Sequence, residues 1–187
     1  MNVIDPRFVV LKLMCNYFEN NNVPYFLGGG ALLGIVREKN FLKWDNDLDI
    51  DIPYEVFAIK KEDILKYLDE NSFNIKKYRA RGYNSKICAE KLGVNVDIIP
   101  YEKLLNLRCR RMSCYPIGFM VNNSHIEFHD LKISTYSTPE QYLEWFYGDW
   151  TAERRGVIKN YVSKKSRTPY LIRSFLYIKS KMAQGVL

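Results

Sequence analysis

The stretch Lys43–Ile52, KWDNDLDIDI, decides the fold and raises the first question about function. An aspartate stands at every second position: Asp45, Asp47, Asp49 and Asp51. Because side chains alternate along a strand, the last three would share one face of a strand over about residues 46–52, with apolar residues on the other face. Crowded carboxylates repel one another, and their burial costs several kcal/mol each unless they are paired. The run is therefore either a solvated acidic edge strand or a set of ligands for a cation.

The composition is that of a globular protein: 187 residues, of which 47% are hydrophobic and 26% are charged. We expect a single domain over residues 1–187, with its core at about 6–150 and a C-terminal helical extension at about 151–187. No stretch is long and apolar enough for a transmembrane helix, and the N-terminus lacks the pattern of a signal peptide. The four cysteines are too sparse for a disulfide scaffold, which favours a reducing, cytoplasmic setting.

The net charge of +7 runs against the acidic stretch, because the basic residues gather elsewhere in the chain. They concentrate at about residues 76–86, 108–111 and 154–167. A basic protein with one compact acidic site suits an anionic ligand that carries a metal ion. The alternative is that lysine and arginine simply cover the surface and keep the protein soluble.

The residue patterns predict an α+β fold with helices packed against a mixed sheet. We expect helices at about 6–20, 31–37, 53–70, 138–147 and 169–182, and strands at about 23–27, 46–52, 73–80, 85–90 and 94–99. Short loops between the last three strands favour antiparallel neighbours. In the helix at 138–147 we expect Tyr142, Leu143 and Phe146 to be buried, and the following Tyr147-Gly148-Asp149 to turn the chain close to the active site.

Three features around the aspartate run favour the cation interpretation over the solvated strand. Gly28, Gly29 and Gly30 stand where a strand gives way to a helix, where a backbone can approach a phosphate closely. Arg37 follows one short helix later and could hold phosphate oxygens, although a surface ion pair is the alternative. Asp97 lies between apolar neighbours in NVDIIPY and needs a partner. A metal ion shared with the first carboxylates would be such a partner.

In combination, these residues resemble the signature of the LicD/fukutin-like proteins, a branch of the nucleotidyltransferase superfamily. The match falls on Gly29, Gly30, Leu32, Leu33, Gly34, Arg37, Trp44, Asp45, Asp47 and Asp49. VDIIPY and TPEQYLEWFYGDW resemble later parts of the family pattern, so the resemblance spans about residues 6–150. Ala31 replaces the usual threonine and Asp51 is an extra carboxylate, but no expected metal ligand is missing.

The resemblance implies a nucleotidyltransferase-like fold and a site for Mg²⁺, with Mn²⁺ as an alternative. The implied catalytic and metal-binding residues are Asp47, Asp49 and Asp97, the last as third ligand or as general base. The implied substrate-binding residues are Gly29 and Gly30 for a diphosphate, Arg37 for a phosphate, and Asp45 in a substrate or supporting role. Asp51 lies roughly 6 to 7 Å beyond Asp49 along the strand, too far to bind the same ion easily, so we expect its replacement by asparagine to be mild.

The family further implies transfer of a phospho-alcohol, such as phosphocholine or a phospho-polyol, from a CDP-activated donor to a glycan, with release of CMP. Two alternatives stay open. One is a true nucleotidyltransferase that uses an NTP and releases pyrophosphate. The other is a non-enzymatic, basic glycan- or RNA-binding module whose acidic strand is solvated. For the enzyme, no nucleic-acid partner is expected.

Two further patterns carry less weight. Cys109, Cys114, His125 and His129 approach a zinc-finger spacing, and the two histidines and Glu127 would share a strand face. We do not expect structural zinc, because unpaired cysteines and ordinary histidines explain the pattern as well. The segment YLIRSFLYIKSKM could form a basic amphipathic helix on a membrane surface, although packing against the domain is the more common arrangement.

Overall fold

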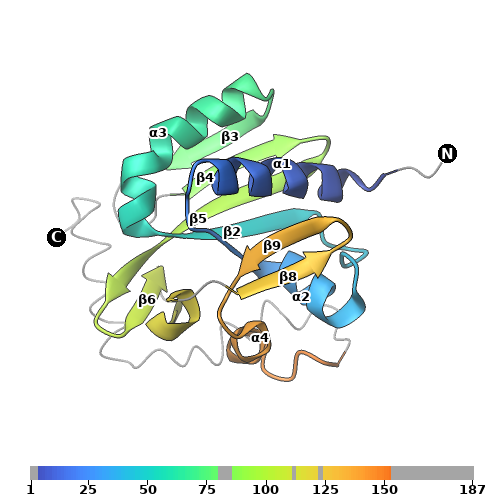
Figure 1. Ribbon diagram of the computed structural model, residues 1–187, viewed down its shortest axis with the longest axis vertical. Helices are drawn as coiled ribbons and strands as arrows, with labels where there is room; N and C mark the ends of the chain where they lie inside the picture. Colours follow the sequence, from blue (N-terminus) through green and yellow to red (C-terminus); the bar gives the residue numbers. More distant parts are fainter. Residues whose placement is uncertain (1–3, 80–85, 111–112, 122–123, 153–187) are drawn as a thin grey trace.

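The computed structural model describes residues 4–79, 86–110, 113–121 and 124–152 (Figure 1). Within them, the helices are α1 (Pro6–Asn20), α2 (Gly29–Glu38), α3 (Tyr54–Glu70) and α4 (Pro139–Tyr147), with a 3-10 turn at Ile117–Met120. The strands are β1 (Phe26–Leu27), β2 (Asp47–Pro53), β3 (Asn74–Arg79), β4 (Lys86–Lys91), β5 (Val94–Leu104), β6 (Leu107–Arg110), β7 (Ser113–Pro116), β8 (Ser124–Phe128) and β9 (Leu131–Thr135). The predicted elements up to residue 147 are confirmed, although β1 is shorter than expected.

The central sheet is mixed and runs in the order β1-β2-β5-β4-β3, while β6 and β7 extend it from β5. β2 and β5 are parallel, and the other pairs are antiparallel. In the parallel pair Asp49 lies opposite Asp97. The aspartate strand therefore does lie beside the Asp97 strand, and β3, β4 and β5 are antiparallel neighbours as predicted.

Helices α1 and α3 pack against each other over the sheet (Figure 1). Asp5 caps α1, because its side chain accepts a hydrogen bond from the Arg7 backbone N–H at 2.8 Å, and Pro6 occupies the first turn. The Tyr17 and Tyr67 rings stack at 4.2 Å, and the Tyr67 hydroxyl donates to the Leu13 carbonyl at 3.0 Å. These contacts join the first helix to the third across a core that both share.

Helix α4 lies near α2, on the side of the molecule that also carries the β8–β9 hairpin (Figure 1). Tyr142 and Leu143 are buried as predicted, but Phe146 is only half-buried, so that part of the prediction is wrong. Phe146 lies at the edge of an aromatic cluster, with its ring 4.7 Å from that of Tyr142. Gly148 ends the helix with a φ of 71°, and its N–H donates to the Glu144 carbonyl at 2.8 Å.

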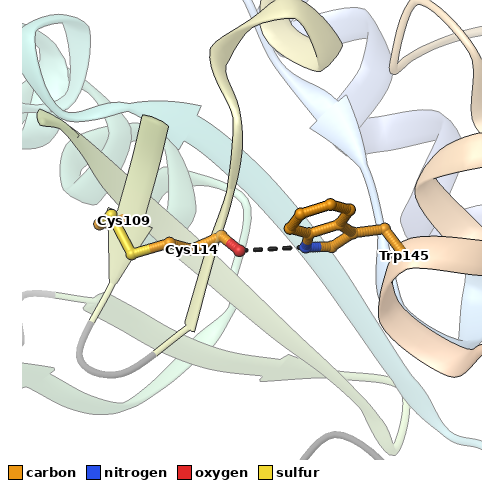
Figure 2. Close-up of a disulfide and its surroundings, with 3 residues drawn as sticks. All are labelled: Cys109, Cys114 and Trp145. Atoms are coloured by element: carbon orange, nitrogen blue, oxygen red, sulfur yellow. Dashed lines mark hydrogen bonds between the residues drawn. A yellow bond between two sulfur atoms is a disulfide. The ribbon is translucent and has the colours of Figure 1, made fainter. Parts of the chain in front are cut away.

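The β6–β7 hairpin contains a disulfide between Cys109 and Cys114, which lie directly opposite each other with Cα atoms 4.2 Å apart (Figure 2). The indole N–H of Trp145 in α4 donates to the Cys114 carbonyl at 3.1 Å. The expectation of unpaired cysteines is wrong for this pair. Because their sulfur atoms are joined to each other, the two cysteines are not available as zinc ligands. The disulfide weakens the cysteine argument for a reducing compartment, since disulfides are rare there.

The two histidines do not share a strand face as expected. His125 is exposed on β8 together with Glu127, whereas His129 lies in the following turn with a φ of 56°. The His129 ring instead contacts Phe8 at 5.1 Å.

The predicted helix at 169–182, its suggested membrane contact and most of the extension at 151–187 lie outside the described residues. Where the structure describes the chain, none of its helices has the length and apolar character needed to cross a membrane.

Candidate active site

The aspartate row is not a solvated edge strand, because β2 lies between β1 and β5. Leu48, Ile50 and Ile52 are fully buried on one face of β2. On the other face exposure falls along the row: Asp47 is exposed, Asp49 is half-buried and Asp51 is 2% exposed. The first interpretation of the sequence run is therefore excluded, and the carboxylates need another explanation.

Each of the three glycines at the start of α2 lies against a different carboxylate. A Cβ atom added to Gly29 would lie 2.1 Å from Oδ2 of Asp49, and one added to Gly30 would lie 1.6 Å from Oδ2 of Asp45. A Cβ atom on Gly28 would lie 3.5 Å from Oδ2 of Asp51. Gly29 also has a φ of 59°, so both its conformation and its surroundings require glycine.

The N-terminus of α2 is thus directed at the acidic row. Gly28 is the N-cap residue and makes no side-chain cap. The backbone N–H groups of the first turn and the positive end of the helix dipole favour negative charge at this place. The Gly29–Gly30 backbone can therefore approach either the carboxylates or a phosphate group that lies beside them.

Asp97 and Asp47 each have a partner in the neighbouring strands. The Lys86 ammonium donates to Oδ2 of Asp97, and the side-chain amide of Asn95 donates to Oδ1 of Asp47 at 2.8 Å. Lys86 lies two residues before Cys88, which is the residue opposite Asp97 in β4. The structure thus brings Asp47, Asp49 and Asp97 to one place and adds a cation beside them.

Negative charge accumulates around Asp49. Burial and, to a smaller extent, the charges of Asp97, Asp45 and Asp47 raise the pKa of Asp49 to about 7, and Lys86 opposes this rise. Burial also raises the pKa of Asp45 above its ordinary value. A carboxylate with several like charges and one cation nearby is stabilised in its ionised form by a bound divalent cation.

Asp51 belongs to a different environment from the other aspartates. The hydroxyl of Tyr136 donates to Oδ2 of Asp51, and the Tyr136 ring stacks on Tyr142 with centroids 3.5 Å apart. Burial raises the pKa of Asp51 to about 8, although the hydrogen bond from Tyr136 opposes this. Asp51 therefore faces the aromatic core behind the site, and the expectation that it does not bind the same ion stays a prediction.

Tyr147 is a site residue to which the sequence reasoning gave no role. Burial raises its pKa, and the charges of Asp49, Asp45 and Asp51 raise it further. The phenol at the end of α4 thus lies within electrostatic reach of the acidic row and stays protonated at neutral pH. The prediction that the Tyr147-Gly148-Asp149 turn lies close to the site is supported by this coupling.

Arg37 is the predicted site residue that the structure does not bring to the glycines. It lies in the last turn of α2, roughly 12 Å along the helix axis from Gly29 at 1.5 Å per residue. Its guanidinium donates to the carbonyls of Trp150 at 3.2 Å and Ala152 at 3.5 Å, and pairs with Glu38 at 2.8 Å. A phosphate-binding role for Arg37 stays a prediction, and its present contacts attach the chain after α4 to α2.

The oxygen atoms at this site suit a hard cation whose coordination shell is completed by oxygens of the substrate. No three His, Cys, Asp or Glu side chains in the described residues are arranged as a ready-made metal site. Mg²⁺ does not require one, because it usually binds through one or two carboxylates together with substrate phosphates. The oxygens of Asp47 and Asp49, beside a helix N-terminus that accepts phosphate, fit that mode of binding.

Comparison with known proteins agrees with this geometry. Residues 22–143 match the model of the LicD/FKTN/FKRP nucleotidyltransferase domain. The uncharacterized protein RP689 of Rickettsia prowazekii is 33% identical over 135 residues, which is 72% of this chain and 48% of that protein. The lipopolysaccharide cholinephosphotransferase LicD of Haemophilus influenzae is 47% identical over 50 residues, which is 25% of this chain and 18% of that protein. The chain thus spans about half or less of the curated relatives that it matches.

The fold is also that of known nucleotidyltransferases. The crystal structure of the lincosamide antibiotic adenylyltransferase LnuA with lincomycin bound has a TM-score of 0.55 and 16% identity, and the match covers 87% of this chain and 96% of that one. At this identity the likeness concerns the fold alone. The family match covers most of the present sequence, including the glycines, the aspartate row and Asp97. The chain belongs to the LicD/FKTN/FKRP family, and its matched domain has the nucleotidyltransferase fold.

Proposed function

We propose that this domain transfers a phospho-alcohol, such as phosphocholine or a phospho-polyol, from a CDP-activated donor to a glycan hydroxyl and releases CMP. The observation that carries the proposal is the pairing of Asp49 with Asp97 in adjacent parallel strands, with the start of α2 packed on Asp49. The name of the Haemophilus influenzae relative supports this class of reaction.

The positions of the residues support the following roles. The acceptor oxygen attacks the phosphorus that carries the alcohol, the bond from this phosphorus to the CMP oxygen breaks, and CMP leaves with the electron pair. Asp47 and Asp49 would hold Mg²⁺, with Mn²⁺ as an alternative, and the ion supplies charge neutralisation at the transferred phosphoryl group. The first N–H groups of α2, at Gly29 and Gly30, bind the diphosphate and orient it.

The proton of the acceptor hydroxyl needs a base beside the reacting phosphorus. Asp97 is the candidate, and its partner Lys86 holds the carboxylate in place. Asp45 adjoins Gly30 and accepts a hydrogen bond from the Asp47 backbone N–H at 3.2 Å, so it fixes the start of the row. We further propose a cytoplasmic location, at which CDP-linked donors would be available.

The test is a product assay with purified protein, Mg²⁺ and a panel of CDP-choline, CDP-ribitol, CDP-glycerol and the four NTPs. We expect release of CMP from at least one CDP-linked donor, and a loss of about a hundredfold or more in Asp49→Asn, because metal charge stabilisation is worth several kcal/mol. Asp130→Asn is the matched control, since Asp130 is an exposed partner of Lys12 in the turn between β8 and β9, outside the acidic row.

The products separate the alternatives. Pyrophosphate from an NTP, with no CMP from any donor, would establish nucleotide transfer, the class of reaction for which the adenylyltransferase LnuA is named. The absence of both products, with an Asp49→Asn variant that binds the same ligands as the wild type, would leave a binding module. A thermal-shift screen of the same panel identifies the donor first, because a ligand that binds the folded state raises the melting temperature.

A further inference from the structure

A pocket of about 440 Å³ opens beside the acidic row and is not used by the roles assigned above. It is lined by the start of α1, by the turn before β2 and by the turn between β4 and β5: Asp5, Pro6, Arg7, Lys43, Trp44, Asp45, Asn46, Leu92 and Val94. We refer to it as the Trp44 pocket. Its lining includes Asp45, which also adjoins Gly30 at the start of α2. A ligand in this pocket therefore lies next to the carboxylates of the active site.

The Trp44 pocket has accessible apolar side chains in its otherwise polar wall. Trp44 is 44% exposed and Leu92 is 60% exposed, although both are large hydrophobic side chains. Exposed hydrophobic surface that lines a concave site is typical of ligand binding, and an indole provides a flat face for a ring. Lys43, Asp45 and Asn46 supply polar groups around the same opening.

The charges that line the pocket indicate what kind of ligand it takes. The two carboxylates, Asp5 and Asp45, are balanced by two cations, Arg7 and Lys43. A phosphate would require an excess of cations, and a quaternary ammonium group an excess of aromatic and acidic groups. A neutral ligand with many hydroxyl groups needs both donors and acceptors beside an apolar face, which is the combination present here.

The pocket is held in shape by contacts that join its walls. Arg7 donates to the Leu42 carbonyl at 2.7 Å and to the Asp45 carbonyl at 2.8 Å, and pairs with Asp5 at 2.6 Å. The side-chain amide of Asn46 donates to the Gly93 carbonyl, which ties the two turns together. A preorganised site loses less entropy on binding, so these contacts favour a specific ligand over a casual surface depression.

We infer that the Trp44 pocket binds a sugar ring of the acceptor glycan, stacked on Trp44 and Leu92, with a hydroxyl directed past Asp45 toward the active site. The inference rests on the proposed function for the identity of the acceptor. It adds the place of the acceptor, which neither the metal-binding row nor the glycine turn supplies. The pocket would thus determine which sugar is modified.

The test observes Trp44 directly and does not depend on turnover. The protein is labelled with 5-fluorotryptophan, the Trp44 signal in the ¹⁹F NMR spectrum is assigned with Trp44→Phe, and the methyl glycosides of glucose, galactose, N-acetylglucosamine and N-acetylgalactosamine are titrated. We expect at least one of them to shift the Trp44 signal saturably in the millimolar range while the Trp145 signal stays constant.

A matched pair of variants checks the apolar wall. Leu92 and Leu105 are both exposed leucines in turns with positive φ, 53° and 52°, and only Leu92 lines the pocket. Asparagine tolerates this conformation, so both variants keep the fold. Leu92→Asn should weaken glycoside binding about tenfold, since apolar contact with a ring is worth roughly this much, whereas Leu105→Asn should leave it unchanged.

Three results would overturn the inference. One is a Trp44 signal that no glycoside shifts, and another is a shift produced by choline chloride or CMP but by no glycoside, which would assign the pocket to the donor. The third is equal weakening by the two leucine variants. Failure of the proposed function is seen separately: a protein that binds glycosides at Trp44 but releases no CMP from any donor keeps the pocket and loses the reaction.

Discussion

Alanine substitutions at four glycines separate two costs that the structure assigns to the glycine turn, backbone strain and collision with a carboxylate. Gly29 has both, with a φ of 59° and Asp49 Oδ2 at 2.1 Å from an added Cβ. Gly93 has only the strain, with a φ of 76° and nothing within 4 Å. Gly30 has only the collision, at 1.6 Å from Asp45 Oδ2, and Gly118 has neither.

The expected losses in the free energy of unfolding follow from these contacts. A left-handed alanine costs about 1 to 2 kcal/mol, which is the whole expectation for Gly93→Ala. Gly29→Ala adds the displacement of Asp49, whose Cγ and Cβ also lie at 2.9 and 3.0 Å, so rotation of the carboxylate alone gives no relief. Overpacking of this kind adds about 1 to 3 kcal/mol.

Gly30→Ala should cost about 1 kcal/mol or less, because the half-buried Asp45 side chain can rotate away from the new methyl group. Gly118→Ala should be neutral within about 0.5 kcal/mol. Urea denaturation at pH 7 measures all four values. Release of CMP should fall about a hundredfold in Gly29→Ala, since a displacement near 1 Å can cost that much, and should be unchanged in Gly118→Ala. Equal destabilisation by Gly29→Ala and Gly93→Ala would refute the reasoning, because the carboxylate would then contribute nothing.

Three further predictions concern residues around the row. Because the folded-state pKa of Asp51 is about 8 against an ordinary 3.8, the folded protein binds the extra proton and its metal-free stability should fall as pH rises from about 4 to about 8. Asp51→Asn should flatten this slope in urea denaturation at pH 5 and pH 8, whereas parallel profiles would contradict the burial argument. Tyr147→Phe removes a buried hydroxyl near Asp49 and should lower CMP release about tenfold with little change in melting temperature; unchanged release would exclude a role in the reaction. Reduction of the Cys109–Cys114 disulfide, which closes a short loop, should lower stability by about 2 kcal/mol in urea with and without dithiothreitol, and identical curves would contradict this.

The pairing of the two acidic strands could be predicted because both carry the signal locally. Apolar residues surround the aspartates in both strands, DLDIDI and VNVDII. The chain between them includes a helix, and such a long connection allows β2 and β5 to run parallel. The same reasoning could not place Asp51. Its partner Tyr136 stands 85 residues further along the chain, in a segment with no pattern of its own. The sequence shows that Asp51 is on the acidic face, but not that tyrosines cover it there.

Arg37 and Lys86 show a second limit. Arg37 follows Gly29 by only eight residues, so its sequence position suggests a common site. Both residues lie in α2, however, and eight residues of helix place Arg37 about two turns away from Gly29. Lys86 stands 11 residues from Asp97, and the antiparallel hairpin brings its side chain to the carboxylate. Spacing along the chain thus misleads for a residue at the far end of a helix. For a residue on a neighbouring strand it helps only when the register is known, and here the register depends on the turn at Leu92–Gly93.

The glycine run and the aspartate run are best regarded as one structural unit whose two halves constrain each other. β1 runs antiparallel to β2 with Phe26 opposite Asp51 and Leu27 opposite Ile50, and the Gly28 N–H donates to the Asp49 carbonyl at 2.9 Å. The glycines that follow contact the carboxylates in reverse order of sequence. Gly28 lies against Asp51, Gly29 against Asp49 and Gly30 against Asp45. A side chain on either of the last two glycines would occupy the space of a carboxylate oxygen.

Consecutive glycines thus lie against aspartates that are two or four residues apart. The backbone turns from strand into helix at Gly29, so three adjacent residues pass over a stretch of β2 and of the turn before it, and only the residues on one face of the strand point toward them. The aspartates of the row therefore have different surroundings. Asp51 meets the aromatic core, Asp49 meets the helix start and Asp97, and Asp45 meets both Gly30 and the Trp44 pocket. A shift of β2 by one residue would turn the carboxylates toward the apolar face and destroy the fold and the site together.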